Sequence, residues 1–153
     1  MFVCVVYKLQ RTTVLISCQL LAQSVTDIRK KAGAARQGLG RTGERLATEE
    51  LVRRGYRILE QNFRCSHGEI DLVAEDEHDL IFVEVKTRRG NKYGLPEEAV
   101  TYRKRQKIVQ VACYYLDLHA CSERSWRIDV VAVQLSKGGK PEEIRIYQHA
   151  VTE

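Results

Sequence analysis

The stretch from Gly68 to Arg88, GEIDLVAEDEHDLIFVEVKTR, decides the fold of this chain. Two runs within it, residues 69–74 and 80–86, have strand length and are rich in Ile, Val and Phe. The polar connection DEHD suits a hairpin, and the shortest closure puts Glu75 opposite Leu80. The sequence therefore predicts two neighbouring antiparallel strands.

This register predicts a close pair of acidic side chains. Asp71 falls opposite Glu84, and Glu69 falls opposite Lys86, which shares a strand face with Glu84. Directly opposite residues have Cβ atoms roughly 4.5–5.5 Å apart, and like charges at that position destabilise a sheet. A divalent cation between the carboxylates compensates the repulsion, as Mg²⁺ is usually held by one or two carboxylates. Lys86 could then orient or activate a water molecule.

A second interpretation of the same residues stays open. Glu-x-Lys is a common triplet, and a solvated strand face would let Lys86 pair with Glu69 and Asp71 as ordinary ion pairs. The two opposed acids favour the cation site over this arrangement.

The hairpin and its flanks resemble the YraN-like family, small bacterial proteins grouped with the restriction-endonuclease-like PD-(D/E)xK nucleases. The likeness covers about residues 39–133. The motifs that carry it are GEIDLVA with FVEVKTR, Gly43-Glu44 with Ala47 and Leu51, Gly55-Tyr56-x-Ile58-Leu59-x-x-Asn62-x-Arg64, Gly94-x-Pro96, Val100-x-x-x-Lys104 and Arg127-Ile128-Asp129-Val130-Val131.

The resemblance implies a fold and a site. The fold would be α/β (α+β), with a restriction-endonuclease-like mixed β-sheet flanked by helices. The catalytic residues would be Asp71, Glu84, Lys86 and Glu44, and the metal ligands would be Asp71, Glu84 and the backbone carbonyl of Val85. The implied cofactor is Mg²⁺ or Mn²⁺.

Basic residues follow the hairpin closely. The net charge of +5 is uneven, because residues 1–41 hold seven Lys/Arg against one acid and the rest holds 18 against 19. Arg88, Arg89 and Lys104 lie in basic clusters downstream of Lys86, and such a rim beside an acidic pocket suits a phosphodiester. We therefore predict nucleic acid, with DNA foremost, as the partner of these three residues.

The chain is organised as one domain with an extension. Residues 1–38 form the expected N-terminal extension, with a flexible lead-in near its end, and residues 39–153 form the endonuclease-like domain. The five cysteines are odd in number and lack zinc-site spacing, which indicates free thiols in a reducing cytoplasm. No run approaches the ~20 apolar residues of a membrane span. A homodimer is a further expectation, from the related fold.

Periodicity and turn residues predict the remaining elements. The expected core includes Ile58 and Leu59 on the first strand and Leu118 on the second helix, and Asp129 is interpreted as a structural acid. The expected elements are a helix over residues 42–54, a strand over 56–63, a helix from Pro96 to about Leu118, a strand over 126–133 and an edge strand over 143–147.

Three functional hypotheses follow. The first is a metal-dependent endonuclease that hydrolyses phosphodiester bonds in nucleic acid, reads backbone shape, and acts on DNA that includes branched DNA. The second is a non-catalytic nucleic-acid-binding protein on the same fold. The third treats the acids and Lys86 as one salt-bridge network on a protein that binds another protein.

Overall fold

A computed structural model describes residues 33–90 and 102–150. The chain divides into two units, residues 1–38 and residues 39–153, and the β-sheet belongs to the second unit. The expected N-terminal extension lies mostly outside the described residues, so its role stays a prediction. In the described part of the chain, no helix is long and apolar enough to cross a membrane.

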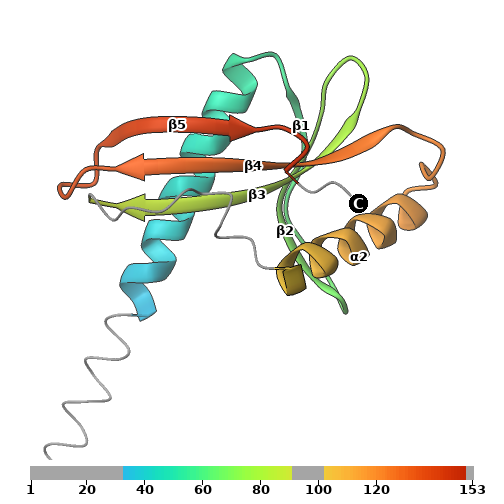
Figure 1. The fold of residues 1–153 in the computed structure, drawn as a ribbon, viewed down its shortest axis with the longest axis horizontal. Coiled ribbons are helices and arrows are strands. Elements are labelled where there is room, and N and C mark those ends of the chain that lie inside the picture. The colour runs from blue at the N-terminus through green and yellow to red at the C-terminus, as the bar shows by residue number, and fades with distance from the viewer. Residues whose placement is uncertain (1–32, 91–101, 151–153) are drawn as a thin grey trace, which may run out of the picture. The chain divides into compact units, whose positions relative to one another are not determined.

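A five-stranded mixed sheet forms the centre of the domain, in the order β1-β2-β3-β4-β5 (Figure 1). Neighbouring strands run antiparallel except β3 and β4, which are parallel. The predicted α+β fold with a mixed sheet is confirmed, and β5 is an edge strand as expected. The strands are β1 Arg57–Cys65, β2 Gly68–Glu75, β3 Leu80–Arg89, β4 Trp126–Leu135 and β5 Pro141–Tyr147.

Two helices cover opposite faces of this sheet. The N-terminal helix, of which residues 33–53 are described, buries Leu46, Ala47 and Leu51 against one face. Helix α2, Tyr102–Leu118, buries a second stripe on the other face. Alternate residues of β3 divide between the two cores, since Ile81 and Val83 pack under the N-terminal helix while Leu80 and Phe82 pack under α2.

Three expectations about these elements are wrong. The N-terminal helix includes residues 33–40, which belong to the stretch expected as a flexible lead-in, because Ala, Arg and Gln there are good helix formers. Leu59 is 37% exposed because a register shift between Ile58 and Glu60 rotates it out of the core. Leu118 is 59% exposed at the end of α2, and Leu116 is buried instead. The expected start of that helix at Pro96 lies outside the described residues.

A buried arginine ties the β2–β3 turn to β4. Arg127 is 7% exposed and pairs with Asp76 at 2.8 Å, Asp79 at 2.6 Å and Asp129 at 3.2 Å. Asp129 also accepts the backbone N–H of His149. These bonds give Asp129 the structural role that the sequence suggested.

The hairpin register is confirmed only in part. The ladder joins Glu75 to Leu80 and continues to Leu72 and Val83, as predicted. The next predicted pair, Asp71 with Glu84, is not a ladder pair, because the β2–β3 ladder ends there while the first residues of β2 stay paired with β1. The two strands therefore separate into a fork at Asp71.

Candidate functional site

The Asp71 side chain occupies the fork between β2 and β3. Its Oδ2 accepts the backbone N–H of Val85 at 2.7 Å. If the ladder continued, the backbone carbonyl of Ile70 would accept this N–H instead. The N–H and C=O of one strand residue point to the same edge, so the Val85 carbonyl also points toward β2. A carboxylate and a backbone carbonyl are thus directed into the same gap.

Asp71 is held in an environment that disfavours its charge. Burial raises the pKa of Asp71 to about 6, and the negative charges of Glu84 and Glu44 act in the same direction. The Val85 N–H bond and the Lys104 ammonium group oppose this shift. Groups from both helices therefore act on the same half-buried carboxyl, because the fork opens the sheet between them.

Glu84 is buried, at 5% exposure, and faces two lysines. Lys86 Nζ donates to Oε1 at 2.5 Å, and Lys104 Nζ lies 3.1 Å from Oε2. The second contact has the distance of an ion pair but not the angles of a hydrogen bond, so Oε2 accepts none within the described residues. The two lysine side chains are 26% and 33% exposed, so both extend from the buried carboxylate toward solvent.

The N-terminal helix brings Glu44 to the fork through a close contact with β3. A Cβ atom added to Gly43 would lie 1.6 Å from Thr87 Oγ1, which shows that only glycine allows this approach. Glu44 follows directly, half-buried, on the side of the sheet opposite α2. The family-like Gly43-Glu44 pair thus has a physical reason: the first residue sets the distance and the second carries the charge.

The donor chemistry of this site fits a hard divalent cation. Asp71 and Glu84 offer carboxylate oxygens, one of them buried without a hydrogen bond, and burial together with the charge of Glu84 raises the pKa of Asp71. Within the described residues, no group of three or more His, Cys, Asp or Glu side chains is placed to hold a metal ion, so protein side chains would supply at most two carboxylates. That arrangement suits Mg²⁺, which keeps several waters and is held by one or two carboxylates plus substrate phosphates.

The other predicted site residues divide into two sets. Arg88 lies on the β3 face that carries Glu84 and Lys86. Arg89 is exposed on the alternate face, and one of its guanidinium nitrogens lies 3.2 Å from the position that a Cβ atom on Gly139 would take. The predicted pairing of Glu69 with Lys86 is absent, because Glu69 pairs with Arg64 at 3.2 Å.

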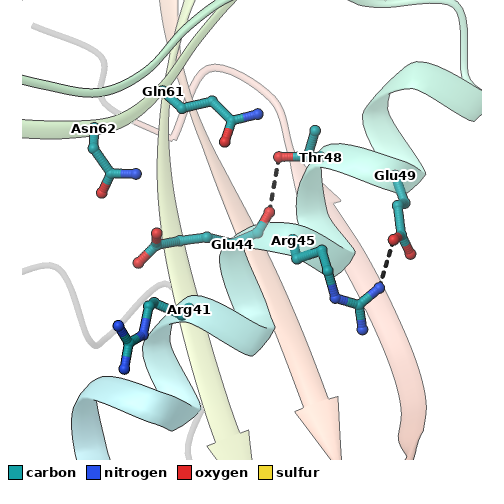
Figure 2. Close-up of a pocket in the computed structure, with 7 residues that line it drawn as sticks. All are labelled: Arg41, Glu44, Arg45, Thr48, Glu49, Gln61 and Asn62. Atoms are coloured by element: carbon teal, nitrogen blue, oxygen red, sulfur yellow. Dashed lines mark hydrogen bonds and ion pairs between the residues drawn. The ribbon is translucent and has the colours of Figure 1, made fainter.

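Sequence analysis did not identify a polar pocket beside Glu44, shown in Figure 2. Its volume is about 430 Å³, and it lies between the N-terminal helix and β1. The one sequence signal was Asn62 in a family-like motif, to which no role had been assigned. The lining residues are Arg41, Glu44, Arg45, Thr48, Glu49, Gln61 and Asn62.

The sheet order and the two covering helices place the protein among α+β proteins with a restriction-endonuclease-like architecture. Within that class the chain belongs to the Uncharacterised protein family UPF0102, whose model matches residues 43–133, and the YraN-like assignment is confirmed.

Bacterial relatives share much of this domain. A UPF0102 protein of Syntrophus aciditrophicus is 48% identical over 107 residues, which cover 70% of this chain and 81% of the relative. A UPF0102 protein of Trichlorobacter lovleyi is 47% identical over 110 residues, covering 71% and 87%.

A solved structure, Pyrococcus furiosus SfsA in complex with Ca²⁺, matches at a TM-score of 0.35 and 16% identity. It covers 77% of this chain and 65% of that one, and a likeness so remote carries no argument.

Proposed function

We propose that the protein is a metal-dependent endonuclease that hydrolyses phosphodiester bonds in DNA. The observation that carries the proposal is the fork, where the β2–β3 ladder ends and the Asp71 carboxylate takes the N–H of Val85. A side chain that replaces a strand partner at this point brings the Asp71 carboxylate to the edge of β3 toward which the Val85 carbonyl points, close to the charge of Glu84.

Some residues at the fork would bind the metal ion, and Lys86 would act on the attacking water molecule. Asp71, Glu84 and the Val85 carbonyl would hold Mg²⁺ or Mn²⁺, and Glu44 of the N-terminal helix would complete the site through a water molecule. The bound ion would polarise the scissile phosphate and make a water molecule easier to deprotonate. Lys86, released from Glu84 Oε1, would orient that water.

Basic side chains at the rim would hold the phosphate oxygens. Lys104 reaches the site from α2 and is one-third exposed, and Arg88 extends the same face of β3. Arg89 lies on the alternate face and would contact a more distant phosphate. Contacts of this kind position a backbone without reading bases, so recognition would depend on DNA shape, with branched DNA among the substrates.

A cleavage assay tests the proposal on linear duplex, single-stranded and four-way-junction DNA, with Mg²⁺ or Mn²⁺. Asp71→Ala and Glu84→Ala should each abolish cleavage, whereas Glu77→Ala, an exposed acid in the same hairpin, should leave it unchanged. Cleavage that survives both site substitutions would refute the assignment. Sedimentation of the same preparations tests the homodimer, which stays a prediction.

One observation favours a second function, a nucleic-acid-binding protein that does not cut. Glu84 already has two ammonium groups beside it, Lys86 and Lys104, so the buried charge is compensated without a metal ion. For such a protein, DNA binding would persist in EDTA and calorimetry would detect no Mg²⁺ or Mn²⁺ binding. The endonuclease requires the opposite calorimetric result.

A further inference from the structure

The pocket beside Glu44 has the size and chemistry of a binding site for one small polar group. Its volume of about 430 Å³ lies within the range of roughly 300–1,000 Å³ that is usual for ligand pockets. Its lining side chains come from the helix and from β1, and Figure 2 shows the Glu44 carboxylate between the Asn62 amide and the Arg41 guanidinium.

Several polar groups of this pocket have hydrogen-bonding capacity that the protein does not use. Among the described residues, the side chains of Arg41, Gln61 and Asn62 make no hydrogen bond or ion pair. Arg45 differs, because it pairs with Glu49 at 2.5 Å. The pocket therefore presents a guanidinium and two amides, each amide with both a donor and an acceptor.

The pocket adjoins the fork. The neighbours of Asn62 on β1 pair with Leu72 and Ile70, so Asn62 lies across from Asp71. The backbone of Asn62 has a φ of 57°, a conformation that asparagine tolerates better than most residues and that interrupts the regular strand here. Glu44 lines the pocket and also acts electrostatically on Asp71, so the pocket and the acidic site share a wall.

We propose that this pocket takes one unpaired nucleotide of the substrate next to the bond that is cleaved, an inference that rests on the proposed function. The amides of Gln61 and Asn62 would contact the edge of the base, as these side chains do when they read bases. Arg41 would hold the adjacent phosphate.

A base inside a duplex cannot enter such a pocket without leaving the stack, which costs a few kcal/mol. Substrates in which the nucleotide is already unpaired avoid that cost. The preferred substrates would therefore be single strands, flaps, gaps and branch points, and a blunt duplex would be a poor substrate.

Fluorescence anisotropy in EDTA, and again with Mg²⁺, tests the proposal by comparing a labelled single strand with the matching blunt duplex. The main variant combines Gln61→Ala with Asn62→Gly, because glycine keeps the positive φ while removing the amide. A second variant is Arg41→Ala, and its matched control is Arg53→Ala, which removes an exposed arginine from the same helix outside the pocket. All four residues are exposed, and thermal unfolding of each variant checks that the fold is kept.

The double variant should raise the Kd for the single strand by about tenfold and leave the Kd for the duplex within about twofold. Arg41→Ala should weaken single-strand binding clearly more than Arg53→Ala does. An unchanged ratio of the two Kd values in the double variant, or equal effects of the two arginine substitutions, would overturn the proposal.

These binding results are separate from cleavage. If the wild-type protein cuts no DNA but the double variant raises the ratio of the single-strand Kd to the duplex Kd as expected, the pocket stands and the endonuclease assignment fails. If the double variant cuts single strands with unchanged KM and kcat, the endonuclease stands and the pocket fails.

Discussion

Replacing Asp71 with asparagine should stabilise the ion-free protein at neutral pH. Asparagine has nearly the same shape and keeps an oxygen that can accept the Val85 N–H, but it carries no charge. The substitution therefore removes the repulsion from Glu84 and Glu44 and the cost of burying an ionised group, while it preserves the fork.

The magnitude follows from the pKa of Asp71, which rises from 3.8 to about 6 on folding. One pKa unit corresponds to 1.36 kcal/mol, so the penalty for ionised Asp71 is at most about 3 kcal/mol, and solvent access to this half-buried side chain lowers it. Between pH 3.8 and about 6 the folded protein keeps a proton that the unfolded chain has lost. Stability therefore falls as pH rises through this window, and the penalty is complete above it.

Urea unfolding in EDTA, from pH 4 to pH 8, measures this effect as the difference in unfolding free energy between Asp71→Asn and wild type. The difference should grow in favour of the variant across that window and level off above it. Asp117→Asn, at an exposed acid of α2, is the control and should show no such growth. If the proposed metal site is correct, added Mg²⁺ should stabilise the wild type and reduce the difference, since the substitution removes one of the two proposed carboxylate ligands. A variant that is less stable than wild type at pH 8 in EDTA would refute the reasoning, because Asp71 would then be stabilised by a lysine.

Three further substitutions probe the parts that build the site. Gly43→Ala should lower the free energy of unfolding in urea by about 1–3 kcal/mol, because the added methyl group overlaps Thr87. Adding Thr87→Gly to this variant should recover part of the lost stability. If Gly43→Ala alone leaves the stability unchanged, the close contact is contradicted. Arg127→Met should lower the free energy of unfolding by about 3–5 kcal/mol, because it leaves the carboxylates of Asp76, Asp79 and Asp129 without their arginine partner. An unchanged Tm would argue against this ion-pair network. Glu84→Gln should abolish calorimetric heat of Mn²⁺ binding, and retained heat would place the ion elsewhere.

The hairpin could be predicted because residues close together in the sequence determine it. Strand-like alternation and a short polar connection set the Glu75–Leu80 register, and the structure has that register. The fork could not be predicted in the same way, because it depends on the Asp71 side chain displacing a backbone partner of Val85. Extrapolating the ladder placed Asp71 as a strand partner of Glu84, whereas the structure places it as a side-chain cap on the adjacent residue.

The positions of the site residues on the two helices could also be predicted only in part, because some of them depend on contacts between distant parts of the chain. The sequence pattern predicted Lys104 in a basic rim beside the acidic pocket, and its ammonium group lies 3.1 Å from Glu84. The pocket on the other side needed three-dimensional contact between β1 and the N-terminal helix, which no local pattern specifies. Leu59 was misplaced for a related reason, since one register shift in β1 reverses which side chains face the core.

The charges around the fork argue that the ion-free site is incomplete. Asp71, Glu84 and Glu44 bring three carboxylates, while Lys86 and Lys104 bring two ammonium groups, so these five side chains together carry one excess negative charge when ionised. A divalent cation reverses the sign of that excess, and one phosphate group of DNA then restores neutrality. Burial is the main cause of the elevated pKa of Asp71, and the charges of Glu84 and Glu44 add to it; a bound cation would offset that added repulsion as a proton does. The cation and the phosphate should therefore bind cooperatively, each with higher affinity when the other is present, and metal affinity measured without DNA should be the weaker value.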